Sequence, residues 1–302
     1  MKNKKIRRRI RAVLLAVVVI CLVLIGREYA LSARHKAQKE ALLEQLKRAE
    51  NERENGKPAK ELPKGGQESE KADGDLADSA AEGKDAEEVR MGEDKVAVLE
   101  EYAGLYEENE DMAGWLSVEG TKIDYPVMQG EDDEYYLHHD FYGQESKYGC
   151  LYVRNRADID KGTNFVVYGH NMKDGSMFGE LDLYLEEGFY REHPLIRFDS
   201  LFEKRTYEII AVFRSQVYDQ AEDVFRYYQF YEADTEEEFD DFYENIKALS
   251  LYDTGVEAQF GDQFITLSTC AYHVEDGGLW WWQNGRRKNG NRRKSRLPNL
   301  KL

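Results

Sequence analysis

Short apolar segments rich in β-branched and aromatic residues recur from about residue 112 to residue 270, with no regular alternation of strand and helix. Because a parallel α/β sheet requires that alternation, the pattern predicts a mainly β domain, an antiparallel barrel or sandwich. Two of the predicted strands flank a turn at Glu119-Gly120. The others cover residues 148–155, 164–171, 193–200, 205–216 and 263–270.

Two helices are predicted to pack on this β structure. Apolar residues recur at nearly helical spacing over residues 96–106. The second helix begins at the cap-like pair Asp234-Thr235 and carries acidic residues in its first turn. Its apolar face is predicted to consist of Phe239, Phe242, Ile246 and Leu249.

The N-terminus has the pattern of a signal anchor. Seven Lys or Arg residues precede an apolar run from Ala12 to Gly26. The run is about 15 residues long, shorter than the roughly 20 that usually span a membrane, but flanking arginines extend it by snorkelling. We predict an uncleaved anchor over residues 1–33 with a cytoplasmic N-terminus, placing the rest outside the cell; cleavage near residues 30–33 is the alternative.

An acidic, largely disordered tether is predicted over residues 34–88. Residues 34–54 favour a short solvated helix through helix formers and i, i+4 charge pairs. The remainder contains almost nothing to bury. The formal net charge of −17 argues against nucleic acid as a partner of the folded part, which is predicted to begin at residue 89.

Cys270 and His170 are the candidate catalytic residues. Each stands at the end of a predicted strand, in "FITLSTC" and "FVVYGHNM", and Gly169 is expected to let the backbone turn before the histidine. A thiol is mostly protonated at neutral pH; a neighbouring imidazolium favours the thiolate, and the same imidazole can later protonate a leaving amine. The residues alone leave a purely structural role open for both.

Other reactive side chains have simpler interpretations. Cys21 and Cys150 are read as small hydrophobic residues, and His138 and His139 as surface or hydrogen-bonded groups. His273 lies on the loop after Cys270 and is not expected to be catalytic. Residues 132–134 are interpreted as a solvated acidic turn because no regular calcium-ligand spacing follows. No metal site or cofactor is predicted.

Three segments resemble the sortases, the membrane-anchored cysteine transpeptidases of Gram-positive bacteria. They are "NEDMAGWLSVEGTKIDYPVMQ" (109–129), "VVYGHNM" (166–172) and "TLSTC" (266–270). The segment "DEYYLHHDFYGQESKYGCLYV" and the helix before the cysteine strand are most similar to class B. The resemblance implies an eight-stranded β-barrel with helical additions, in a catalytic domain over residues 89–278.

The resemblance also implies a reaction. Cys270 attacks the carbonyl of a Thr in the C-terminal sorting motif of a surface protein, and His170 protonates the leaving amine. His170 then activates an amine of a cell-wall precursor or pilin, while Ser268 and Thr269 line the peptide groove. Two alternatives stay open: a cysteine peptidase or amidase that releases the acyl group to water, and a catalytically impaired surface protein.

An arginine that the resemblance leads one to expect is missing. Sortases stabilise the oxyanion with an arginine on the strand after the cysteine strand, and class B has it at the head of a run like Arg-x-Val-Val. The matching place here is Gly278, followed by Leu279 and three tryptophans. Loss of such a donor typically costs about 10²–10³ in rate.

The genetic code suggests a reason for the missing arginine. Trp has the single codon TGG, so the run Trp280 to Gln283 read one base earlier encodes Val, Leu or Met followed by Val-Val-Ala, and the codon overlapping Gly277 and Gly278 permits Arg. We therefore predict a one-base frameshift near Gly277 that disrupts the last strand and makes residues 279–302 an aberrant basic tail. The rivals are a genuine tail that binds a membrane through Trp and Arg, or nucleic acid through its basic patch.

Overall fold

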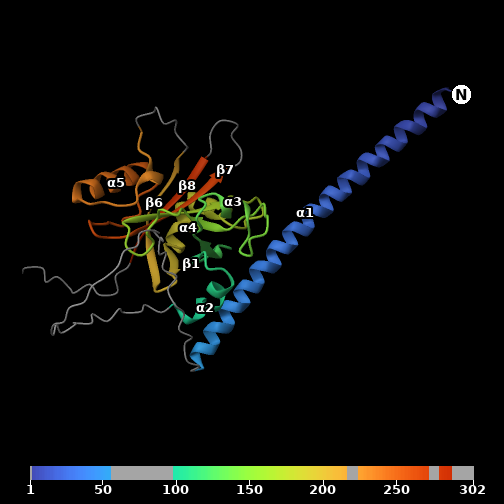
Figure 1. The fold of residues 1–302 in the computed structure, drawn as a ribbon. Helices are drawn as coiled ribbons and strands as arrows, with labels where there is room; N and C mark the ends of the chain where they lie inside the picture. The colour runs from blue at the N-terminus through green and yellow to red at the C-terminus, as the bar shows by residue number, and fades with distance from the viewer. Residues whose placement is uncertain (1, 56–97, 216–223, 272–278, 288–302) are drawn as a thin grey trace, which may run out of the picture.

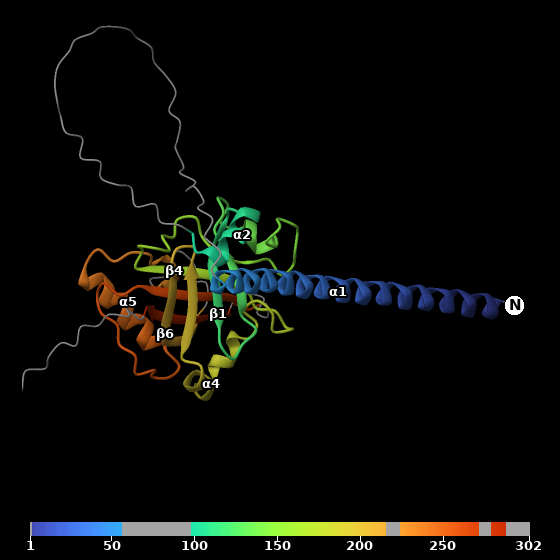
Figure 2. The ribbon, with the colours of Figure 1, turned by 90° about the horizontal axis from the view of Figure 1, so that it is seen from below.

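A computed structural model describes residues 2–55, 98–215, 224–271 and 279–287. Figures 1 and 2 show a β-barrel from which one long helix, α1, projects. The helices and 3₁₀ turns are α1 (Lys2–Glu54), α2 (Glu100–Glu108), α3 (Tyr135–His138), η1 (Leu181–Leu185), α4 (Glu187–Glu192), η2 (Tyr227–Gln229) and α5 (Glu236–Leu249). The strands are β1 (Met112–Val118), β2 (Asp124–Met128), β3 (Leu151–Val153), β4 (Asn164–His170), β5 (Leu195–Ser200), β6 (Lys204–Ser215), β7 (Phe264–Ala271) and β8 (Leu279–Arg287).

The eight described strands close into a barrel in the order β1-β2-β3-β4-β7-β8-β6-β5. All neighbouring pairs are antiparallel except β2–β3 and β4–β7. Glu119-Gly120 forms the predicted turn between β1 and β2, with Gly120 at a φ of 78° that few other residues adopt. The predicted mainly β, eight-stranded barrel is confirmed.

The barrel interior is filled by alternate residues of the strands. Buried side chains from seven of the strands form one apolar cluster, including Leu116, Val127, Leu151, Val167, Ile196, Val212 and Leu267. A second cluster lies outside the barrel wall, where Phe239 of α5 stacks on Phe264 at 5.2 Å between ring centroids. The helix before the cysteine strand therefore covers the barrel from outside.

Helix α5 begins as its sequence predicts. The Thr235 side chain accepts a hydrogen bond from the Glu238 backbone, and the Glu238 side chain accepts one from the Thr235 backbone. Phe239, Phe242 and Ile246 are buried, as predicted. Leu249 is 42% exposed, so its assignment to the packed face was wrong: it is the last residue of the helix, beyond the turn that contacts the barrel.

Strand β8 corrects one expectation. Residues 279–287 form a strand that pairs with β7 on one side and β6 on the other, with a register shift between Ile209 and Ala211 of β6. The expected disruption of the last strand is therefore wrong for the backbone of this segment. The structure describes no side chain of β8, and residues 288–302 lie outside the described part of the chain.

Helix α1 contains both the apolar run and the segment that follows it. Its apolar residues from Ile10 to Ile25 are 50–67% exposed, and its length and composition suffice to cross a membrane. Residues 34–54 are helical, as predicted, but they continue α1 and do not form a separate short helix. They are also not simply solvated: Leu42 and Leu46 are buried against the barrel domain. The rest of the predicted tether, from residue 56, lies outside the described residues.

Candidate active site

The ends of β4 and β7 bring two predicted site residues together. These strands are parallel neighbours, and His170 and Cys270 are partners in their register. All seven residues of β4 are buried, so this strand is packed on both faces. Because neighbouring strands run roughly 5 Å apart, the two residues lie side by side at the carboxyl end of both strands.

The alternation of side chains along β4 and β7 assigns each position to a face. Thr266 Oγ1 donates to Asn164 Oδ1 at 2.8 Å outside the barrel, whereas Val167 and Leu267 belong to its interior cluster. His170 follows Asn164 at an even spacing and shares its face. Cys270 is the register partner of His170.

The predicted groove residues Ser268 and Thr269 lie on opposite faces of β7. Ser268 shares the face of His170, and Thr269, the register partner of Gly169, lies on the interior face. Both are completely buried, and neither hydroxyl has a hydrogen-bond partner among the described residues. Of the two, Ser268 is therefore the better placed to contact a ligand beside His170.

Gly169 serves a different purpose from the expected turn. It lies within β4, and a Cβ there would come within 2.4 Å of Leu151 Cδ2 and 2.8 Å of Phe178 Cδ2. The glycine is required because the barrel interior is full at this level, and the strand continues through His170 without a break.

His170 is held in an enclosed setting. His170 is only 3% exposed, and its Nε2 lies 2.8 Å from the carbonyl oxygen of Leu137. A carbonyl only accepts, so Nε2 carries the proton of this hydrogen bond. Desolvation lowers the pKa of His170, the bond to Leu137 opposes that shift, and the charge of His138 adds to it. Burial thus favours the neutral imidazole.

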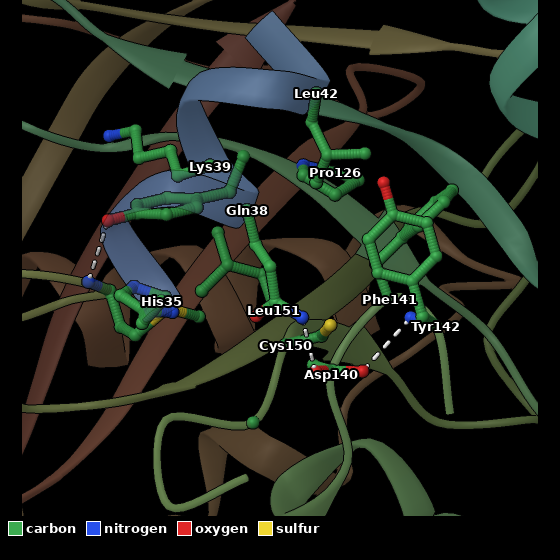
Figure 3. A pocket seen from close by; sticks show the side chains of 13 residues that line it. His35, Gln38, Lys39, Leu42, Pro126, Asp140, Phe141, Tyr142, Cys150 and Leu151 are labelled. Atoms are coloured by element: carbon green, nitrogen blue, oxygen red, sulfur yellow. Dashed lines mark hydrogen bonds between the residues drawn. The ribbon is translucent and has the colours of Figure 1, made fainter. Parts of the chain in front are cut away.

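Helix α1 contacts the loop that carries Leu137. Figure 3 shows Gln38 reaching Asp140, whose carboxylate accepts from Gln38 Nε2 at 2.8 Å. The same carboxylate accepts from the backbone of Tyr142 and Gln144, which fixes the loop. A cavity of about 30 Å³ separates α1 from this loop and is lined by Leu42 among others. Helix α1 therefore packs on the loop that supports the candidate site.

The remaining candidates have structural surroundings. His139 Nδ1 lies 2.8 Å from the Tyr135 carbonyl oxygen and its ring stacks on that tyrosine, while His138 is exposed. Cys150 is buried, which raises the pKa of its thiol. Within the described ranges, no group of three or more His, Cys, Asp or Glu residues is arranged to hold a metal ion. His273 and Gly278 lie outside the described residues.

Comparison with known proteins identifies the fold. A model of the sortase domain matches residues 116–278, more than half of the chain. This chain belongs to the sortase family. Its relatives include sortase B of Listeria monocytogenes, 38% identical over 180 residues that cover 57% of this chain and 68% of the relative. Sortase B of Staphylococcus aureus is 27% identical over 184 residues, covering 61% and 72%.

Solved structures agree with the sequence relatives. Sortase B from Bacillus anthracis is 31% identical with a TM-score of 0.55, over 63% of this chain and 86% of that one. Sortase B from Listeria monocytogenes is 34% identical with a TM-score of 0.53, over 60% and 97%. This sortase is therefore of class B, and its family supports transpeptidase chemistry in general.

Sequence reasoning missed two features of the site. The first is the backbone carbonyl of Leu137 as a partner of His170, since a carbonyl has no side-chain signature. The second is the packing of α1 on the domain. Leu42 and Leu46, four residues apart among charged neighbours, were the available signal for a helix face that is buried.

Proposed function

We propose that this sortase cleaves a C-terminal sorting motif after a Thr residue and joins the acyl group to a cell-wall or pilin amine. Cys270 is the nucleophile and His170 the general acid and base. The observation that supports this assignment best is the register of β4 and β7, which pairs the two residues at the same end of parallel strands. The membership of the class B sortases supplies the reaction type.

The first half-reaction forms the acyl-enzyme. The thiol proton passes to His170, and the Cys270 sulfur attacks the Thr carbonyl carbon to give a tetrahedral oxyanion. The oxyanion collapses, the C–N bond breaks, and the imidazolium returns its proton to the leaving amine. A thioester joins Cys270 to the Thr carbonyl, and the C-terminal part of the substrate departs.

The second half-reaction is the reverse with a new amine. His170 takes a proton from the incoming amine as the amine nitrogen attacks the thioester carbonyl carbon. The C–S bond then breaks, and the Cys270 sulfur leaves as a thiol with the proton of the imidazolium. An amide replaces the thioester, so no oxidant or cofactor is needed. Burial lowers the pKa of His170 and so favours the neutral imidazole, which suits the base of this step.

The predicted anchor gives the reaction its place. The exposed apolar part of α1 would hold the domain at the outer surface of the membrane, with the N-terminus in the cytoplasm. Surface proteins bearing a sorting motif would be the acyl donors there, and the growing wall or a pilin the acceptor.

A trapping experiment tests the proposal. Peptides carrying candidate sorting motifs are incubated with the full chain, and a thioester on Cys270 is sought by mass spectrometry. Cys270→Ala should abolish the adduct and Cys21→Ala should not, since Cys21 lies in the apolar part of α1. An adduct that persists in Cys270→Ala would refute the assignment of the nucleophile.

The acceptor decides between transpeptidase and hydrolase. The same reaction is followed with and without an added amine such as oligoglycine. Formation of the amide product at the expense of free acid is expected for a transpeptidase. Release of the free acid alone, whatever the amine concentration, would show the peptidase or amidase alternative.

A further inference from the structure

The loop from α3 to β3, residues 135–150, presents one backbone carbonyl to His170. Leu137 lies within the four-residue helix α3, and its oxygen accepts from His170 Nε2 at 2.8 Å. Leu137 and His170 are 33 residues apart in the sequence, and their contact joins the loop to the end of β4. Because Nε2 holds the proton, the neutral ring has its basic lone pair on Nδ1.

Gly149 lies against the same carbonyl. It has a φ of 57°, and a Cβ at this position would lie 2.6 Å from the Leu137 oxygen and 2.6 Å from the Tyr136 oxygen. The obstructing atoms are backbone, not the ends of flexible side chains. The Tyr136 carbonyl also accepts from the Cys150 backbone at 2.8 Å, so a side chain at 149 would have to displace both carbonyls.

The loop is fixed at several other points. The Asp140 backbone donates to Gln144, Ser146 donates to the His138 carbonyl, and His139 pairs with Glu145 in an isolated bridge. These bonds restrain the loop, so the α3 carbonyls cannot move aside without a wider rearrangement.

We propose that Gly149 is a positioning residue for His170: its missing side chain lets the Leu137 carbonyl reach Nε2 and fix the ring in the tautomer whose Nδ1 is the base. The catalytic part of this inference rests on the proposed function, in which His170 exchanges a proton with Cys270. The same bond stabilises the imidazolium that forms when the thiol is deprotonated, because the Nε2 proton keeps its acceptor in both states.

A second glycine in the loop provides a matched control. Gly143 also has a positive φ, of 69°, but a Cβ there would meet only the Tyr135 hydroxyl, at 3.2 Å. Gly143→Ala and Gly149→Ala therefore impose similar backbone strain on the same loop. They differ in whether the new methyl group displaces the Leu137 carbonyl.

The experiment reads the tautomer directly. The full chain is labelled with ¹⁵N-histidine, and the signals of His170 are assigned by their loss in His170→Gln. The wild-type protein should show His170 protonated at Nε2. The Gly149→Ala variant should show a mixture of tautomers or a shifted Nε2 signal, and Gly143→Ala should retain the wild-type signals. Protonation at Nδ1 in the wild-type protein would overturn the proposal, even if Gly149→Ala does not fold.

Alkylation of Cys270 by iodoacetamide, mapped by mass spectrometry, adds a chemical readout. We expect Gly149→Ala to lower its rate at least about tenfold, since a histidine in the wrong tautomer no longer assists the thiol. Gly143→Ala should stay within about twofold of the wild type. Equal rates in the two variants would overturn the positioning role. Failure of peptides to acylate Cys270 would count against the proposed function instead, and the histidine signals would still decide this inference.

Discussion

The register of β8 makes a sharp prediction about Gln283. Its Cα pairs with that of Leu267 on one side and that of Val212 on the other. Both neighbours belong to the interior cluster and are at most 2% exposed. Residues directly opposite one another in antiparallel strands share a face, so position 283 belongs to the barrel interior, where the strands supply apolar side chains.

An amide at such a position is costly. Burying a side-chain amide without full hydrogen bonding costs about 1–3 kcal/mol in proteins. Methionine has nearly the same length and shape, so Gln283→Met removes the amide without opening a cavity. We expect a gain of about 1–3 kcal/mol in the free energy of unfolding. For a domain of this size, that corresponds to a rise in melting temperature of about 2–12 °C.

Thermal unfolding followed by circular dichroism measures the change. Gln259→Met is the matched control, because Gln259 is exposed and its substitution should change stability by no more than about 0.5 kcal/mol. An unchanged or lowered melting temperature for Gln283→Met, with the control unaffected, would show that position 283 is not an interior position. The register of β8 would then be wrong.

Three further predictions concern the site and its support. Replacing residues 278–283 by Arg-x-Val-Val-Val-Ala should raise the rate of acyl-enzyme formation about 10²–10³-fold, measured as thioester with a sorting-motif peptide, and an unchanged rate would show that the missing arginine does not limit this step. Burial lowers the pKa of His170, so as the pH falls below about 6.5 the unfolded state binds a proton more readily than the folded state. The free energy of unfolding of the wild type, relative to that of His170→Gln, should therefore decline from about pH 7.5 to about pH 5 in urea titrations. A pH-independent difference would contradict this. Leu42→Ala should cost about 2–5 kcal/mol if α1 is part of the folded domain, against a negligible effect of the exposed Lys47→Ala.

Local sequence signals predicted the elements of this fold well. The β-branched run of β4 and the capping box of α5 depend on interactions within a few residues, and both formed as expected. The pairing of β4 with β7 depends on about 100 intervening residues folding around it, which no local pattern encodes. The motifs nonetheless named His170 and Cys270, because reactive residues at strand ends are visible in the sequence.

Contacts made by the backbone explain most of what sequence reasoning missed. The Leu137 carbonyl would be the same for almost any residue at 137, so its role follows only from where the loop lies. The need for glycine at 149 is likewise set by two carbonyls, those of Tyr136 and Leu137 in the preceding helix α3. A sequence pattern records which side chains are present. The first of these features is a contact of a backbone carbonyl, and the second is a position where a side chain would not fit.

The backbone of β8 also bears on the origin of the tryptophan run. The backbone register gives position 283 to the interior face, between Leu267 of β7 and Val212 of β6. The chain as written supplies Gln there, whereas the reading shifted by one base supplies Ala, which suits a filled interior. The shifted reading also permits Arg at 278, immediately before β8 begins and two residues ahead of the Cα partner of Cys270. A one-base shift therefore gives this strand both a residue that suits the interior and the expected arginine. A genuine basic tail does not explain why the shifted reading would supply both. Resequencing the 3′ end of the gene separates the two: clean reads that encode Gly-Gly-Leu-Trp would refute the frameshift.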